Sequence, residues 1–362
     1  MTVLAHGVGE RHDLPLPLDL VLQGAAVALL ASFLALGVLW TKPRFVARVE
    51  VTRRDRWWPV RVVVAGGLVL VPAGAWPHLV FVLVWVGVAV LSMVVGPVWR
   101  VVNPLRLAAR WSVGREYPAW LGYWPAAGGL LAFTWVELVE PGALAWFLVV
   151  YAVVGVVGGV VFGDAWFEHA DGFEVYSTLL GRLSPLRGNP FRGLVGTPAK
   201  PGLVAVVAVC LGSTAFDSIG STPSWARWGV PDWVGLVGAV VVVAGSYLWA
   251  CRAFGAELAH SLIPIVAGYV VAHYFSLLLV EGPRAVALLV GADGFEPVEP
   301  VPVVVASVQI GAVLAGHVVA VVSAHDRSLR LLPPERQLTG QVPLLLLMVG
   351  YTAGGLALLF AG

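Results

Sequence analysis

Apolar runs long enough to cross a lipid bilayer recur along almost the whole 362-residue chain. A membrane-spanning helix needs about 20 predominantly apolar residues. Hydrophobic residues make up 59% of the sequence and charged residues only 12%, whereas an ordinary soluble domain is about 25% charged. We therefore predict an all-α, polytopic integral membrane protein whose main partner is the lipid bilayer.

Ten predicted spans divide the chain. Their bounds are 19–40, 60–76, 78–96, 120–136, 143–163, 203–219, 232–251, 260–280, 301–323 and 342–361. The second span is short and contains Pro72. Residues 1–18 form an N-terminal segment outside the bundle. Residues 19–362 form a single transmembrane domain, in which 164–202 is the longest cytoplasmic loop.

The Lys and Arg residues set the predicted orientation, because cytoplasmic loops of membrane proteins are enriched in both. With the N-terminus outside the cytoplasm, the cytoplasmic segments hold 19 of the 22 Lys and Arg residues. These segments are 41–61, 97–119, 164–202, 252–259 and 324–341. One miscounted span would invert every later loop and remove this bias. We therefore predict that both termini are extracytoplasmic.

Charge and motifs exclude several classes of function. The net charge of +1 gives no reason to expect a nucleic-acid partner. The sequence contains no Walker motif, HExxH, GxSxG or CxxCH. ATP hydrolysis, zincin chemistry, serine hydrolysis and covalent c-type haem are therefore unsupported. Any chemistry must use groups within the helix bundle or its short loops.

The predicted span 260–280 carries the side chains that most need an explanation. His273 lies well inside this span, and Tyr269 precedes it by one helical turn. An ionisable residue inside a membrane is costly and usually faces other helices or water. At helical spacing the two side chains share a face. We therefore take His273 as the central proton or ligand group of the predicted site.

Depth along the predicted helices, at about 1.5 Å per residue, sorts the polar residues into two layers. The outer layer comprises Asp217, Tyr269, His273 and Gln309. The inner layer comprises His317, Tyr247 and His260. Such a ladder can serve as a proton relay or a path for a polar solute. The alternative is that these groups form interhelical hydrogen bonds that only hold the bundle together. For Asp217, a bond to a neighbouring histidine and a helix-capping role stay equally open.

The N-terminal segment offers a second kind of site. His6, His12 and Asp13 precede the first span, and imidazole with carboxylate can bind a transition metal such as copper or zinc. His78, at the outer end of the third span, is a further candidate ligand together with the outer polar layer. A solvated, mobile tail is the alternative for this segment.

Local motifs have structural interpretations. Asp164, Glu168 and Asp171 share one helical face, which predicts an amphipathic helix at the membrane interface; metal binding by these carboxylates with His169 is the alternative. The spacing of Gly350 and Gly354 predicts close helix packing. NPLR at 103–106 and NPFR at 189–192 indicate either a faint duplication or two similar turns.

A family resemblance rests on six segments that follow one another along the chain: AHGVGERHDLPLPL, VVNPLRLAARW, GYWPAAGGLLAFTWVELV, VFGDAWFEHADGFEVYSTLLGRLSPL, LGSTAFDS and IPIVAGYVVAHYFSLLLVEG. Together they resemble an actinobacterial polytopic membrane family commonly labelled fenitrothion hydrolase. The resemblance implies a multi-pass protein of the bacterial cytoplasmic membrane. The label implies hydrolysis of an organophosphate triester, a reaction that usually needs a metal-activated water.

Three functions stay open at this point. The first is the handling of a small solute, ion or metal in an outward-facing cavity with His273 at its centre. The second is membrane-bound, metal-dependent phosphotriester hydrolysis at the outer mouth. The third is a non-catalytic scaffold or partner subunit. A continuous polar path to the cytoplasm favours transport, and a closed outer pocket favours metal chemistry.

Overall fold

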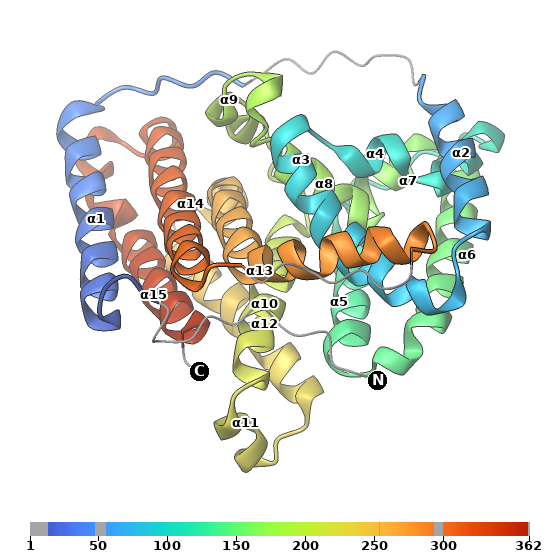
Figure 1. Ribbon diagram of the computed structural model, residues 1–362. Coiled ribbons are helices and arrows are strands. Elements are labelled where there is room, and N and C mark those ends of the chain that lie inside the picture. The colour runs from blue at the N-terminus through green and yellow to red at the C-terminus, as the bar shows by residue number, and fades with distance from the viewer. Residues whose placement is uncertain (1–13, 48–55, 253, 293–299, 361–362) are drawn as a thin grey trace.

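The computed structural model describes residues 14–47, 56–252, 254–292 and 300–360 (Figure 1). In these ranges every regular element is a helix and there is no strand. Eight helical units of the described chain are long and apolar enough to cross a membrane. The prediction of an all-helical, multi-pass membrane protein is thereby confirmed.

The helices follow one another along the chain with short connections. The α-helices are α1 Leu18–Leu39, α2 Trp58–Val69, α3 Val88–Val95, α4 Val98–Val102, α5 Trp124–Leu138, α6 Leu144–Phe162, α7 Asp164–His169, α8 Gly172–Gly181, α9 Pro190–Val195, α10 Leu203–Gly220, α11 Pro223–Trp228, α12 Asp232–Ala250, α13 Ile263–Leu289, α14 Pro302–Leu331 and α15 Val342–Leu359. The tighter 3₁₀ segments include η2 Ala73–Ala75, η4 Pro104–Trp111, η5 Pro141–Ala143, η7 Gly255–Leu262 and η9 Thr339–Gln341, and η3 His78–Gly87 is a π-helix.

The eight membrane-length units are distributed over the whole described chain. They are α1, the unit Ala73–Val95, the unit Pro141–Phe162, α10, α12, the unit Glu257–Leu289, α14 and the unit Thr339–Leu359. The start of α1, the helix α11 and the end of α15 lie at one end of the bundle, and α9 lies at the other (Figure 1). The two ends of the described chain therefore lie on the same side.

Two predicted spans form shorter helices. α2 has 12 residues and α5 has 15. The predicted boundary between the second and third spans is wrong, because α2 ends at Val69 and the next helical unit begins at Ala73 rather than His78. Pro72 lies in this break, where a residue without a backbone N–H cannot continue a helix.

Two other helices continue beyond their predicted ends. α13 runs to Leu289 through Pro283, past the predicted end at residue 280. α14 runs to Leu331, past the predicted end at residue 323. These two helices approach each other closely at Gly268 and Gly316. A Cβ on Gly268 would lie 2.6 Å from the Ala312 carbonyl oxygen, so the contact requires a residue without a side chain.

The predicted cytoplasmic loop 164–202 contains α7, α8 and α9, and α8 is buried on nearly all sides. It packs against α3, α4 and α5. Ser177 Oγ lies 2.8 Å from Ser92 Oγ and accepts the Trp99 backbone N–H at 3.0 Å. The prediction of one amphipathic interfacial helix over 164–174 is wrong, because the segment breaks between α7 and α8 and its Asp171 and Glu174 are buried. The polar groups of α8 find partners inside the bundle instead.

Candidate functional site

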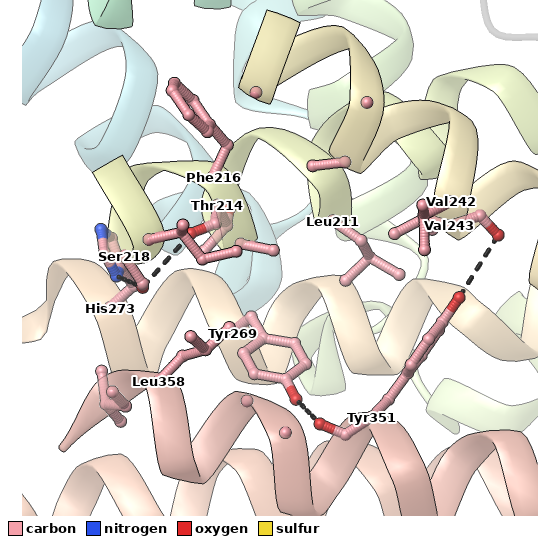
Figure 2. A pocket seen from close by; sticks show the side chains of 18 of the residues that line it. Leu211, Thr214, Phe216, Ser218, Val242, Val243, Tyr269, His273, Tyr351 and Leu358 are labelled. Carbon is pink, nitrogen blue, oxygen red and sulfur yellow. Dashed lines mark hydrogen bonds between the residues drawn. The ribbon is translucent and has the colours of Figure 1, made fainter. Parts of the chain in front are cut away.

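A cavity of about 560 Å³ lies between α10, α12, α13 and α15, with α11 beside it (Figure 2). Most of the side chains that line it are apolar. The polar ones are Thr214, Ser218, Tyr269, His273 and Tyr351. Pockets of roughly 300–1,000 Å³ with a few convergent polar groups are typical of small-molecule sites. We refer to this space as the His273 cavity.

His273 is held on α13 by two neighbours from α10. Its Nε2 lies 2.7 Å from Asp217 Oδ2, and its Nδ1 lies 3.4 Å from Ser218 Oγ. His273 and Asp217 are only 2% and 5% exposed. α10 continues to Gly220, so Asp217 and Ser218 are successive residues of one helix and flank the same imidazole.

This arrangement orients the imidazole toward the cavity. His273 lines the cavity and Asp217 does not, so the histidine lies between the carboxylate and the empty space. When Nε2 carries the ring proton, it donates to Asp217 and leaves Nδ1 as an acceptor. A carboxylate behind an imidazole fixes its tautomer and stabilises its protonated form. The pair can therefore take up and return a proton at the cavity wall.

Two tyrosines form hydrogen bonds between the helices on the far wall of the cavity. Tyr269 donates to the backbone carbonyl of Tyr351. The Tyr351 hydroxyl lies 2.7 Å from Ser246 Oγ and donates to the Val243 carbonyl at 3.3 Å. Figure 2 shows the Tyr269 and Val243 bonds as dashed lines. These bonds join α15 to α12 and α13 at this end of the cavity.

Glycines create part of the volume. Gly238 of α12 and Gly350 and Gly354 of α15 line the cavity, and a Cβ built on any of them meets nothing within 4 Å. The prediction that Gly350 and Gly354 serve close helix packing is therefore wrong. Their missing side chains leave open space rather than a tight contact.

The predicted polar layers are only partly brought together. Asp217, Tyr269 and His273 meet at the cavity. His317 lies behind Tyr269, with the two rings edge to face at 5.7 Å. Gln309 is fully buried on α14 and is not one of the residues that line the cavity.

The remaining two residues of the predicted inner layer have local partners. Tyr247 is fully buried and hydrogen-bonds to Cys251. His260 Nδ1 lies 3.1 Å from the Glu257 carbonyl oxygen. Neither lines the cavity, so of the two predicted layers only the outer one contributes side chains to the cavity wall.

The predicted metal ligands are not assembled in the described chain. His78 Nε2 lies 3.6 Å from Glu281 Oε2, and Glu281 also binds Arg284 at 2.7 Å. Among the residues that the structure describes, no three or more His, Cys, Asp or Glu side chains are close enough to hold a metal ion. His6, His12 and Asp13 lie outside the described residues.

One acidic residue near the site was missed by the sequence analysis. Glu137, near the end of α5, interacts electrostatically with Asp217. Its Oε2 atom is buried and has no hydrogen-bond partner in the described part of the chain. The predicted fourth span ends at residue 136, directly before this carboxylate. The only signal for it was its position directly after an apolar run.

A second cluster of buried charge, the Arg106 cluster, lies away from the cavity. The Arg106 side chain is 1% exposed and donates at 2.5 Å to both Glu174 and Asp164. Glu168 lies 3.9 Å away and pairs with Arg100 at 2.6 Å. Burial lowers the pKa of Arg106, but the carboxylates outweigh it and the pKa is raised on balance. The guanidinium is therefore held in its charged form.

Asn103 and Asp171 extend this cluster. Asn103 donates from Nδ2 to Asp171 at 2.8 Å, and Tyr151 donates to the same carboxylate at 2.9 Å. Asn103 also caps η4, and Asn189 caps α9 in the same way. The two Asn-Pro motifs therefore share a turn geometry, as expected for Asn before Pro.

A third group surrounds His169 at the end of α7. Its ring stacks between Tyr117 and Tyr123, with centroids 5.3 and 5.8 Å away, and its Nε2 contacts Lys200 Nζ. Burial lowers the pKa of His169, and the charge of Lys200 lowers it further. The imidazole is therefore favoured in its neutral form.

The fold and the site together define a multi-pass membrane protein with a mostly apolar cavity between its helices. Comparisons with protein-family models, with curated proteins and with solved structures found no match.

Proposed function

We propose that the chain crosses the cytoplasmic membrane of a bacterium ten times, with α2 and α5 as the two short crossings and both termini extracytoplasmic. The Lys and Arg distribution supports this topology. The position of both chain ends on one side of the bundle also supports it (Figure 1). In this orientation the His273 cavity lies in the outer half of the membrane.

Within this topology, the proposed function is the binding of a small organic molecule in the His273 cavity, coupled to proton exchange with His273. The observation that carries it is the buried His273–Asp217 pair on the wall of a cavity large enough for a ligand. Burying an imidazole and a carboxylate is costly, and the position of His273 on the cavity wall gives its ring access to a guest. The mostly apolar wall favours an organic molecule over a bare cation, which needs several oxygen ligands.

Chemical modification tests this proposal directly. Diethyl pyrocarbonate reacts with neutral, accessible imidazole, and the modified peptides can be quantified by mass spectrometry. We expect modification of His273 in purified full-length protein. His317 is equally buried but does not line the cavity, so it is the internal control and should stay unmodified.

Two variants extend the test. Asp217→Asn removes the supporting carboxylate and should slow the modification of His273, because the ring is no longer held with Nε2 at Asp217 and Nδ1 free to react. Gly354→Leu fills the cavity and should also protect His273. Equal reactivity of His273 and His317, or no reaction at either, would contradict the proposal.

Ester hydrolysis is the second candidate, since the His273 imidazole lies between the Ser218 hydroxyl and the Asp217 carboxylate. This order of groups resembles that of hydrolases in which a histidine activates a serine. The metal-dependent version would draw its additional ligands from His6, His12 and Asp13. Paraoxon, which releases nitrophenolate, is a direct probe. Release that depends on both Ser218 and His273 would favour the metal-free route, and release that depends on added zinc and on His6 would favour the metal route.

A further inference from the structure

We infer that the His273 cavity is entered sideways from the bilayer, between α12 and α15, and that it receives a single-chain lipid-soluble molecule with a hydroxyl head. This inference rests on the proposed binding function and names its ligand class. It follows from the exposure of the lining residues, the contacts that close the cavity and the chemistry of its polar end.

The two helices that border the cavity both lie at the perimeter of the bundle. Val234, Gly238 and Val242 of α12 line the cavity at a spacing of four residues, and all three are exposed. Val242 is 66% exposed. On α15, the lining residues Gly350 and Gly354 are exposed in the same way. The lining stripe of each helix therefore merges with its outer surface, and no described element covers the space between them.

The lining of α12 also reaches the side of the helix that faces the bundle. Val243 is buried and lines the cavity, and so do the half-buried Gly235 and Ala239. The cavity is therefore a crevice that opens laterally between two perimeter helices and extends inward to α10 and α13.

The crevice is closed at one end. The Tyr351 hydroxyl binds Ser246 and the Val243 carbonyl, so α12 and α15 are in contact there. Both helices are long and apolar enough to span a membrane. The opening between them consequently faces hydrocarbon, and the molecules that reach it are those dissolved in the bilayer.

The polar side chains at one end of the crevice determine which head group a ligand can have. His273 Nδ1 has only the 3.4 Å contact with Ser218 Oγ, and that hydroxyl also donates to the Thr214 carbonyl at 3.4 Å. A ligand hydroxyl can donate to Nδ1 and accept from Ser218, because it has both capacities. No Lys or Arg is among the described residues that line the crevice, and Asp217 lies behind His273. A carboxylate head would meet negative charge without a counterion, so the site favours a neutral hydroxyl.

Photolabelling in nanodiscs tests the inference with the full-length protein. The probe is hexadecanol carrying a diazirine near the end of its chain, and adducts are mapped by peptide mass spectrometry. Excess unlabelled hexadecanol defines the saturable part. We expect saturable adducts on the outer half of α12 and on the second half of α15.

Matched glycine variants locate the binding site. Gly354→Leu and Gly350→Leu each start a side chain at a position where a Cβ meets nothing within 4 Å. Each should reduce the saturable adducts about tenfold, the loss expected when about 1.4 kcal/mol of binding is removed. Gly245→Leu on α12 is the control, because Gly245 is exposed, equally uncrowded and not part of the lining. It should leave the adducts unchanged.

The other outcomes overturn specific parts of the inference. Saturable adducts that are equal in all three variants would show that the crevice is not the site. A diazirine fatty acid that labels more strongly than the alcohol would overturn the choice of head group. Labelling by a short water-soluble alcohol but not by hexadecanol would overturn lateral access, while reactive His273 would still support the proposed function. An unreactive His273 would contradict the proposed function itself.

Discussion

The Arg106 cluster and the His273 cavity both place ionisable groups inside the bundle, but they differ in what surrounds those groups. Arg106 is enclosed by the carboxylates of Asp164, Glu168 and Glu174. His273 has one carboxylate partner and one long hydroxyl contact, and its ring borders about 560 Å³ of open space. The Arg106 guanidinium is paired with carboxylates of the protein itself, whereas one side of the His273 ring is open to a ligand.

The largest expected effect on stability comes from disrupting the Arg106 cluster. Arg106→Met leaves the buried Glu174 without its cation, and loss of one partner of a buried ion pair typically costs about 3–5 kcal/mol. We expect a marked loss of thermal stability, or of folded protein, measured by the temperature at which the purified protein aggregates in detergent. Arg110→Met is the control, because Arg110 is exposed. Equal stability of the two variants would contradict a structural role for the cluster.

A smaller change in stability is expected to distinguish Gly268, which lies in a tight helix contact, from Gly354, which faces open space. Gly268→Ala pushes a methyl group against the Ala312 carbonyl oxygen and should destabilise the protein by about 1–3 kcal/mol. Gly354→Ala adds the same methyl group to open space and should stabilise the helix by about 0.5 kcal/mol, because alanine loses less conformational freedom. Unfolding in a denaturing detergent gives both values. A loss of stability in Gly354→Ala would mean that the crevice is tighter than its geometry shows.

The smallest expected effect is a pH dependence of the protein's thermal stability that comes from His169. Burial and Lys200 hold the pKa of His169 below its ordinary value, so the unfolded chain binds the proton more readily than the folded one. The stabilising contribution is complete above the unfolded pKa of about 6.5 and is lost as the pH falls below it. The melting temperature of His169→Phe should therefore fall less than that of the wild type between pH 7.5 and 5.5. Parallel curves would exclude this group as the cause.

Much of the outer site could be predicted from the sequence because membrane depth follows from position along a span. His273 and Asp217 were assigned to the same outer layer by counting residues at about 1.5 Å each. The structure places these two side chains 2.7 Å apart. The same arithmetic could not distinguish Tyr269, which reaches the cavity, from Gln309, which does not, because depth says nothing about rotation around the helix axis.

The parts that could not be predicted depend on contacts between distant segments. Arg106 and Glu174 are 68 residues apart, and both lie in segments that resembled surface loops. Gly350 and Gly354 have the spacing of a packing motif, yet the neighbouring helix stands away from them. A sequence shows which residues are small, but the position of the adjacent helix decides whether the space beside them is filled or empty.

The contact of Tyr351 with Ser246 and Val243 also determines how the crevice can change its width. Because these bonds hold α12 and α15 together at one level, a change in the angle between the helices moves them apart by an amount that grows with distance from Tyr351. Leu358 lies seven residues beyond Tyr351, about 10 Å along α15. Leu356 and Phe360, on either side of it, are fully buried in a cluster with residues of α1 and α14. α12 is therefore the helix that would move, and a change of about 10° in the angle would widen the crevice at Leu358 by about 2 Å.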